Sequence, residues 1–112
     1  MEFSTTEYKR CTLVKVAGQL NGLTAPDLEK ALNTIVDEGG VYKLVLDMTD
    51  LTFVSSAGWW VLIETQKKCK RYNRGEVVLA AVDARIQDSL RLVGMDTYFK
   101  IFDDVTSAVG SF

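Results

Sequence analysis

The segment KLVLDMTDLTFVSSAGWWVLIETQKKCKR, residues 43–71, decides the fold of this chain. Its first residues belong to a short, mostly apolar run, residues 42–48, which has the length and composition of a buried strand. After a polar break it passes two adjacent serines, a small residue, a glycine and the only two tryptophans of the chain. From about residue 56 to residue 73 the apolar positions then recur with helical spacing. A buried strand followed by a long helix is the building unit of a parallel sheet.

The residues before this segment repeat the same order of strand and helix. Residues 11–20 predict a strand, and residues 2–9 predict an edge strand that pairs with it. A helix follows as far as Gly39. Thr24 and Asp27 have the spacing of a capping box at its start, and Pro26 fits its first turn.

The residues after the segment continue the alternation. Residues 76–82 predict a buried strand, residues 84–93 a helix that Gly94 ends, and residues 98–102 a further strand. A short helix from Val105 closes the chain. Strands that alternate with helices predict an α/β fold with a largely parallel sheet.

The composition excludes several classes of function. The 112 residues are 47% hydrophobic and 25% charged, and the net charge is −2. No basic field favours nucleic acid, and no apolar run is long enough to span a membrane. The N-terminal MEFSTTEYKR lacks the apolar centre of a signal peptide, so we expect a cytoplasmic protein with no membrane association.

Common catalytic and cofactor-binding patterns are missing as well. The chain has no histidine, which removes Ser-His-Asp and Cys-His catalysis. Cys11 and Cys69 stand alone, so we interpret them as small apolar fillers rather than as a metal or redox pair. No glycine pattern typical of nucleotide binding occurs, and no cofactor is expected.

Asp47 ends a predicted strand, as does the phospho-accepting aspartate of a response-regulator receiver. A receiver also needs an acidic pair after its first core strand, where this chain reads VAGQLNGLT with no acid before Asp27. Lys100 could correspond to the receiver lysine. We interpret Asp47 and Asp50 as loop-capping carboxylates, and a receiver-like acceptor at Asp47 stays as an alternative.

Helical phase divides the side chains of the long helix into two faces. The face expected to pack on the sheet carries Val61, Leu62, Thr65, Cys69 and Tyr72. The opposite face carries Glu64, Lys67 and Arg71. Trp60 falls with these charged residues, so we predict that it is exposed and contacts a partner, whereas Trp59 is predicted to pack in the core.

The serine pair stands where the helix begins. Either Ser55 or Ser56 is suited to cap it by accepting a hydrogen bond from a free backbone N–H. The pair also follows a buried strand, and function in α/β proteins concentrates at the carboxyl ends of strands. Ala57 and Gly58 leave the backbone accessible to a docking partner or a phosphate.

Three blocks of this sequence together resemble a STAS domain of the anti-sigma-factor antagonist type. They are VAGQLNGLTAPDLEKAL, KLVLDMTDLTFVSSAGWWVLIETQKKCKR and VVLAAVDARIQDSLRLVGMDTYFKIFDD. The resemblance implies a single STAS domain over residues 1–112. It further implies a mixed, mostly parallel sheet of about five strands, with helices mainly on one face. It also implies a binding module rather than an enzyme.

Members of this type bind an anti-sigma factor that is also a serine kinase, and thereby free a sigma factor for transcription. The kinase phosphorylates a serine at the start of the second long helix, the complex dissociates, and a phosphatase removes the phosphate. By position this serine is Ser56, with Ser55 as a second possible acceptor. The expected partner surface consists of Asn21, Ser55, Ser56, Ala57, Gly58 and Trp60.

The chain departs from the family pattern at three of these positions. Aspartate usually precedes the phosphorylated serine and usually follows the Gly-x-Leu turn, where this chain has Ser55 and Asn21. A small residue is common at the position of Trp60. The alternative within binding modules is a STAS subunit of a transporter or signalling scaffold that is never phosphorylated.

Overall fold

The computed structural model describes all 112 residues and contains one six-stranded sheet. The strands are β1 (Glu2–Glu7), β2 (Thr12–Leu20), β3 (Lys43–Asp47), β4 (Leu51–Val54), β5 (Glu76–Ala80) and β6 (Lys100–Phe102). Five of them lie in the order β1-β2-β3-β5-β6, and β4 pairs with β2. Only β1 runs antiparallel to its neighbour, so the sheet is mixed and mostly parallel, as predicted.

Strand β4 is the element that the sequence analysis did not predict. The first half of β2 pairs with β3, and its last three residues, Gly18 to Leu20, pair with β4. The register shifts between Gly18 and Gln19, and Gly18 has a φ of +94°, which glycine adopts readily. The bend lets one strand serve two neighbours, and it brings the end of β4 beside Leu20.

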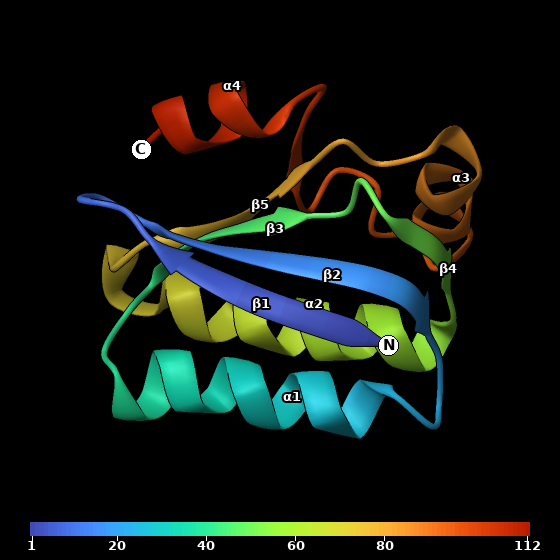
Figure 1. Ribbon diagram of the computed structural model, residues 1–112, viewed down its shortest axis with the longest axis horizontal. Helices are drawn as coiled ribbons and strands as arrows, with labels where there is room; N and C mark the ends of the chain where they lie inside the picture. The colour runs from blue at the N-terminus through green and yellow to red at the C-terminus, as the bar shows by residue number, and fades with distance from the viewer.

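Helices cover the sheet unequally (Figure 1). They are α1 (Ala25–Asn33), α2 (Ser56–Lys70), α3 (Ala84–Leu92) and α4 (Val105–Gly110). A π-helical turn, Thr34–Glu38, extends α1, and a 3₁₀ turn, Arg71–Asn73, follows α2. Helices α1 and α2 lie side by side on one face, α4 lies on the other, and α3 lies beside β4.

Two apolar clusters hold these layers together. The larger fills the space between the sheet, α1, α2 and α3, and includes Leu28, Leu46, Leu62 and Leu90, all fully buried. The smaller lies under α4 and includes Cys11 and Ala108. None of the helices has both the length and the apolar character required to cross a lipid bilayer.

The start of α1 differs from the predicted capping box. Pro26 occupies the first turn as expected, but the Thr24 side chain makes no capping hydrogen bond to the helix. Its hydroxyl instead donates to the carbonyl of Gln19 at 2.8 Å. The hydroxyl is therefore used to hold the loop against β2, and the capping-box prediction is wrong.

The inner face of α2 matches the prediction except at its end. Val61, Leu62, Thr65 and Cys69 are buried. Tyr72 is exposed because the helix ends at Lys70 and Tyr72 takes a φ of +60°, so the helical phase no longer applies.

Gln66 is a fully buried polar residue on that same face. Its amide donates to the carbonyls of Val77 and Tyr98 at 3.0 and 3.1 Å, and its oxygen accepts from the N–H of Val77 at 2.6 Å. The side chain therefore joins α2 to β5 and to the segment before β6, a role that apolar periodicity could not predict.

Candidate functional site

The candidate site lies where β4 passes into α2. Leu20 is opposite Val54 in the β2–β4 pair, and the N–H of Ser55 donates to the carbonyl of Leu20 at 2.8 Å. This hydrogen bond places the first turn of α2 at the carboxyl end of β2. Asn21 follows Leu20 directly, so the loop from β2 to α1 borders the start of α2, as Figure 1 shows.

The two serines have different roles in this geometry. Ser55 is extended, with φ −84° and ψ 171°, and its side chain accepts from the N–H of Gly58 at 3.3 Å. It is therefore the N-cap of α2. Ser56 is the first residue of the helix, and its side chain is exposed and takes no part in the cap. The structure thus leaves Ser56 as the accessible hydroxyl at a helix N-terminus.

Gly58 has an internal reason to be glycine. It is buried, and a Cβ at this position would lie 2.6 Å from Cγ of Leu20 and 3.1 Å from its carbonyl oxygen. The glycine lets α2 approach β2 closely. Of the two small residues in the expected contact surface, Gly58 is therefore buried against β2, whereas Ala57 is exposed.

The adjacent tryptophans point to opposite environments, as predicted. Trp59 is 1% exposed, donates from Nε1 to the Ser89 hydroxyl at 2.8 Å, and packs near the ring of Phe99. Trp60 is 52% exposed. The first tryptophan fastens α2 to α3, and the second presents a large apolar ring beside Ser56.

Asn21 organises the loop that borders this turn. Its side-chain oxygen accepts from the N–H groups of Leu23 and Thr24 at 2.9 and 3.2 Å. The residue is half-buried, and its amide oxygen is used inside the loop. An aspartate would supply the same acceptor, because a carboxylate oxygen can replace the amide oxygen.

Two further apolar side chains are exposed at this end of the molecule. Leu23, in the loop after β2, is 89% exposed, and Phe53, on β4, is 49% exposed. Neither residue was predicted from the sequence as part of the site. Phe53 could have been found only if β4 had been recognised as a strand, and Leu23 only from the position of its loop beside α2.

The acidic residues after β3 have structural partners. Asp47 is buried, and its Oδ1 accepts from the backbone N–H and the hydroxyl of Thr49 at 3.0 and 2.5 Å. This confirms its interpretation as a loop-capping carboxylate. Asp50 instead pairs with Lys15 at 3.1 Å, and this hydrogen bond raises the pKa of the lysine. Lys100, which the receiver alternative would require, pairs with Glu76 at 2.9 Å.

The cysteines are buried and unpaired, as their interpretation as apolar fillers predicts. Burial raises the pKa of the Cys69 thiol to about 11, and it also raises the pKa of Cys11. Neither thiol ionises at neutral pH, so neither is a reactive nucleophile. The structure brings together no group of three or more Cys, Asp or Glu side chains suited to hold a metal ion.

Comparison with known proteins shows the family of this chain. The family model described as the STAS domain matches residues 2–108. The chain belongs to the STAS domain family. The resemblance noted from its three sequence blocks is therefore confirmed, and the order of the strands and helices is that of a known fold.

Three proteins similar to this chain are named as anti-sigma factor antagonists. A candidate anti-sigma factor antagonist from Bordetella bronchiseptica, BtrV, is 28% identical over 95 residues, which are 85% of this chain and 80% of BtrV. A candidate anti-sigma factor antagonist from Thermotoga maritima has a TM-score of 0.89 at 19% identity, over 97% of this chain and 92% of that protein.

The third protein, SpoIIAA of Bacillus, was solved in two states. The unphosphorylated anti-sigma factor antagonist gives a TM-score of 0.82 at 13% identity, over 96% of this chain and 93% of the other. The phosphorylated form gives 0.77 at 13% identity, over 98% of both chains. At this identity the likeness shows the common fold.

Proposed function

We propose that this chain is an anti-sigma factor antagonist, which binds an anti-sigma factor through the start of α2 and loses it when Ser56 is phosphorylated. The observation that carries the proposal is the exposed hydroxyl of Ser56 next to the exposed ring of Trp60. Membership of the STAS family supports it, as do the name of BtrV and the two phosphorylation states of SpoIIAA.

Ser56 is favoured over Ser55 as the acceptor. The Ser55 hydroxyl accepts a hydrogen bond from Gly58, so phosphorylation of Ser55 would disturb the cap. Ser56 is exposed, and its hydroxyl can reach a kinase without any change in the helix. In the reaction the Ser56 oxygen bonds to the γ-phosphorus of ATP, the bond to ADP breaks, and the hydroxyl proton passes to a basic group of the kinase.

The fold is suited to carry the phosphate. Free N–H groups and the positive end of the helix dipole meet at the first turn of α2. A phosphate adds about −1.5 to −2 charges at neutral pH, and a negative charge at a helix N-terminus is stabilised by about 0.3–1 kcal/mol. Phosphorylation therefore changes the surface of the protein and leaves its fold intact.

The partner, by contrast, is released. A surface packed around Ser56 would have to bury a dianion for which it holds no compensating charge. The effective penalty for burying one such ion is several kcal/mol, and each 1.4 kcal/mol is a factor of ten in affinity. Trp60 is the apolar anchor of this surface, Ala57 allows close approach, and Ser55 and Asn21 form its polar border.

The proposed partners follow from this cycle. One is an anti-sigma factor with serine kinase activity, and the other is a phosphatase that hydrolyses the phosphoserine. Such an exchange would regulate sigma-dependent transcription in a bacterial cytoplasm. The chain itself acts in this cycle as substrate and ligand.

The test begins with Ser56→Ala as bait in a lysate of the source organism, since this variant binds the kinase and cannot be released by ATP. The captured kinase is then titrated with wild type, Ser55→Ala and Ser56→Ala, with and without ATP. We expect ATP to dissociate the wild type and Ser55→Ala only. Mass spectrometry should locate one phosphate, on Ser56.

Ser56→Asp provides a second measurement. We expect weak binding to the kinase and a melting temperature close to that of the wild type. Phosphate on Ser55 alone would move the site by one residue. If neither serine is phosphorylated and the bait captures a transporter, the chain is instead a STAS subunit of that transporter, which is never phosphorylated.

A further inference from the structure

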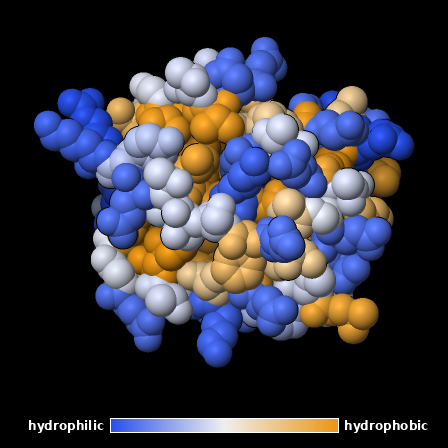
Figure 2. Space-filling model, viewed as in Figure 1, coloured by the Kyte–Doolittle hydropathy of each residue, from blue (hydrophilic) through white to orange (hydrophobic).

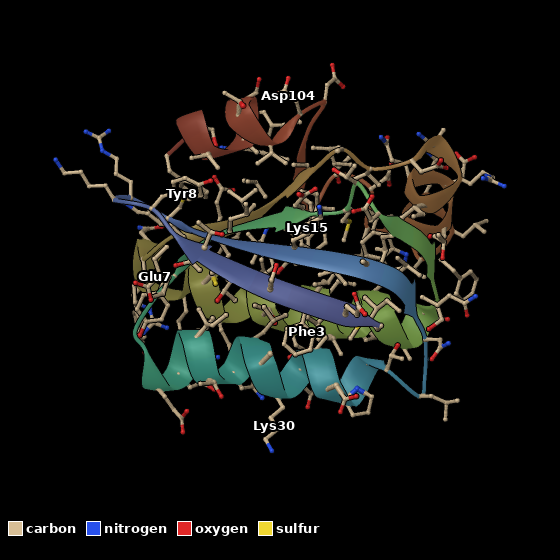
Figure 3. All side chains as sticks on the ribbon, in the orientation of Figure 1. Phe3, Glu7, Tyr8, Lys15, Lys30 and Asp104 are labelled. Atoms are coloured by element: carbon tan, nitrogen blue, oxygen red, sulfur yellow. The ribbon has the colours of Figure 1, made fainter.

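A second surface lies at the end of the molecule opposite Ser56. An open cleft with a volume of about 380 Å³ lies between the β1–β2 turn, the segment before β3 and the residue after the 3₁₀ turn. Four cationic side chains line it, Lys9, Arg10, Lys43 and Arg74, against one carboxylate, Glu7. Figure 3 places Glu7 and Tyr8 at this end, and Figure 2 shows hydrophilic side chains that project from it.

Cations without an acidic partner gather at this end. Six of the 13 lysines and arginines form a salt bridge with a carboxylate, which leaves seven without one. Four of the seven line the cleft. Lys70 and Arg71 lie at the nearby end of α2, and Lys70 shares an adjoining cleft with Lys43. Only Lys30 lies elsewhere, on α1.

Of the four cations that line the cleft, helix capping explains only Arg74. Arg74 donates from its side chain to the carbonyls of Lys68 and Arg71 at the end of α2, and its guanidinium lies 3.9 Å from the centre of the Tyr42 ring. These contacts fix the position of Arg74 without neutralising its charge. Lys9 and Arg10 lie in the β1–β2 turn and Lys43 begins β3, so none of these three cations stands in the last turn of a helix.

We propose that this cleft binds an acidic segment of a partner protein. The charge of the cleft is opposite to that of the whole chain, which has a net charge of −2, so the attraction is confined to this end. Small-molecule pockets are lined mainly by apolar side chains, whereas only four of the 11 residues here are hydrophobic. An open, polar cleft with excess positive charge is better suited to carboxylates on an extended peptide.

This surface is independent of the start of α2. The 15 residues of α2 span about 22 Å at 1.5 Å per residue, and they separate Ser56 from the cleft. Charges that far apart are screened at physiological salt, where the Debye length is about 8 Å. An acidic partner can therefore bind here whether or not Ser56 is phosphorylated, and at the same time as a partner at the other end.

The probe is a fluorescent octapeptide of alternating aspartate and glutamate, with an octapeptide of asparagine and glutamine as its control. Fluorescence anisotropy measures affinity, and amide chemical shifts locate the site. We expect the acidic peptide alone to bind, with shifts confined to residues 7–12, 40–43 and 74. Raising the salt from 50 to 300 mM should weaken binding at least tenfold.

Variants of matched charge complete the test. Lys9→Gln/Arg10→Gln should weaken binding at least tenfold, Lys30→Gln/Arg85→Gln less than twofold, and Ser56→Asp less than twofold. Lys9, Arg10 and Lys30 are exposed, so these variants should fold, which circular dichroism checks. Equal losses in the two double variants, or tighter binding of inorganic pyrophosphate at the same residues, would overturn the proposal. Because Ser56→Asp should leave binding of the acidic peptide nearly unchanged, this test of the cleft can succeed or fail independently of the proposed switch at Ser56.

Discussion

The first turn of α2 and the inner face of the same helix have different surroundings. The first turn exposes Ser56, Ala57 and Trp60, whereas the inner face places Leu62, Gln66 and Cys69 against the sheet with no exposed surface. On the proposed function, recognition and stability are thus assigned to different residues of one helix. Substitutions on the inner face should therefore lower stability, whereas substitutions of the exposed residues of the first turn should affect binding. The predictions below test this difference, from the largest expected cost in stability to the smallest.

Leu62→Ala should strongly lower the free energy of unfolding. The side chain is fully buried in the larger core cluster, and its removal leaves a cavity that costs about 2–5 kcal/mol. Leu92→Ala is the matched control, because Leu92 on α3 is exposed and should cost less than about 0.5 kcal/mol. Urea denaturation measures both. Similar values for the two variants would mean that the phase of α2 is wrong.

Gly58→Ala should have an intermediate effect, although it lies in the first turn. The new Cβ would meet the buried side chain and the carbonyl of Leu20, and such overpacking costs about 1–3 kcal/mol. Gly22→Ala is the control, since nothing lies within 4 Å of a Cβ there. Thermal unfolding compares the two variants. If Gly58→Ala is as stable as the wild type, the close approach of α2 to β2 is not required.

Trp60→Ala should change stability by less than about 0.5 kcal/mol, because the side chain is half-exposed. On the proposed function it should weaken binding of the anti-sigma factor by at least tenfold, since exposed aromatic side chains dominate interfaces. Trp59→Ala is the counterpart and should cost about 3–5 kcal/mol of stability. Should Trp60→Ala unfold the protein while Trp59→Ala does not, the assignment of the two rings must be exchanged.

The sequence was sufficient to predict elements whose apolar pattern is regular. The alternation of strands and helices, the burial of Leu62 and Cys69, and the opposite environments of Trp59 and Trp60 all follow from helical and strand periodicity. The family resemblance rested on three sequence blocks that contain the same strands and helices. These predictions held because packing an apolar stripe against a sheet leaves little choice of orientation.

The sequence was insufficient where a long-range contact decides the structure. Strand β4 has four residues and exists because β2 bends and offers it a partner. Gln66 is buried because carbonyls of Val77 and Tyr98, distant in the chain, accept from it. Gly58 is required because Leu20, which is distant in the chain, packs directly against it. Local patterns do not carry such information.

Asn21→Asp should have the smallest effect on stability. It also tests whether Asn21 belongs to the contact surface. The carboxylate can accept from the N–H groups of Leu23 and Thr24 as the amide does, so the loop is retained. The added charge lies just before the N-terminus of α1, where it is favourable. We expect a melting temperature within about 1–2 °C of the wild type, which corresponds to a few tenths of a kcal/mol.

On the proposed function the same substitution should change the rate at which the kinase phosphorylates Ser56. A unit charge about 4 Å or more from the transferred phosphoryl group in a medium like water contributes at most about 1 kcal/mol, so the rate should change by no more than about fivefold. Asn73→Asp is the control, since Asn73 lies beyond the far end of α2 and should leave the rate unchanged. A faster reaction would indicate a cation of the kinase opposite Asn21, and a slower one would indicate repulsion of the phosphate. An unchanged rate would place Asn21 outside the interface, so that the contact surface would be the first turn of α2 alone.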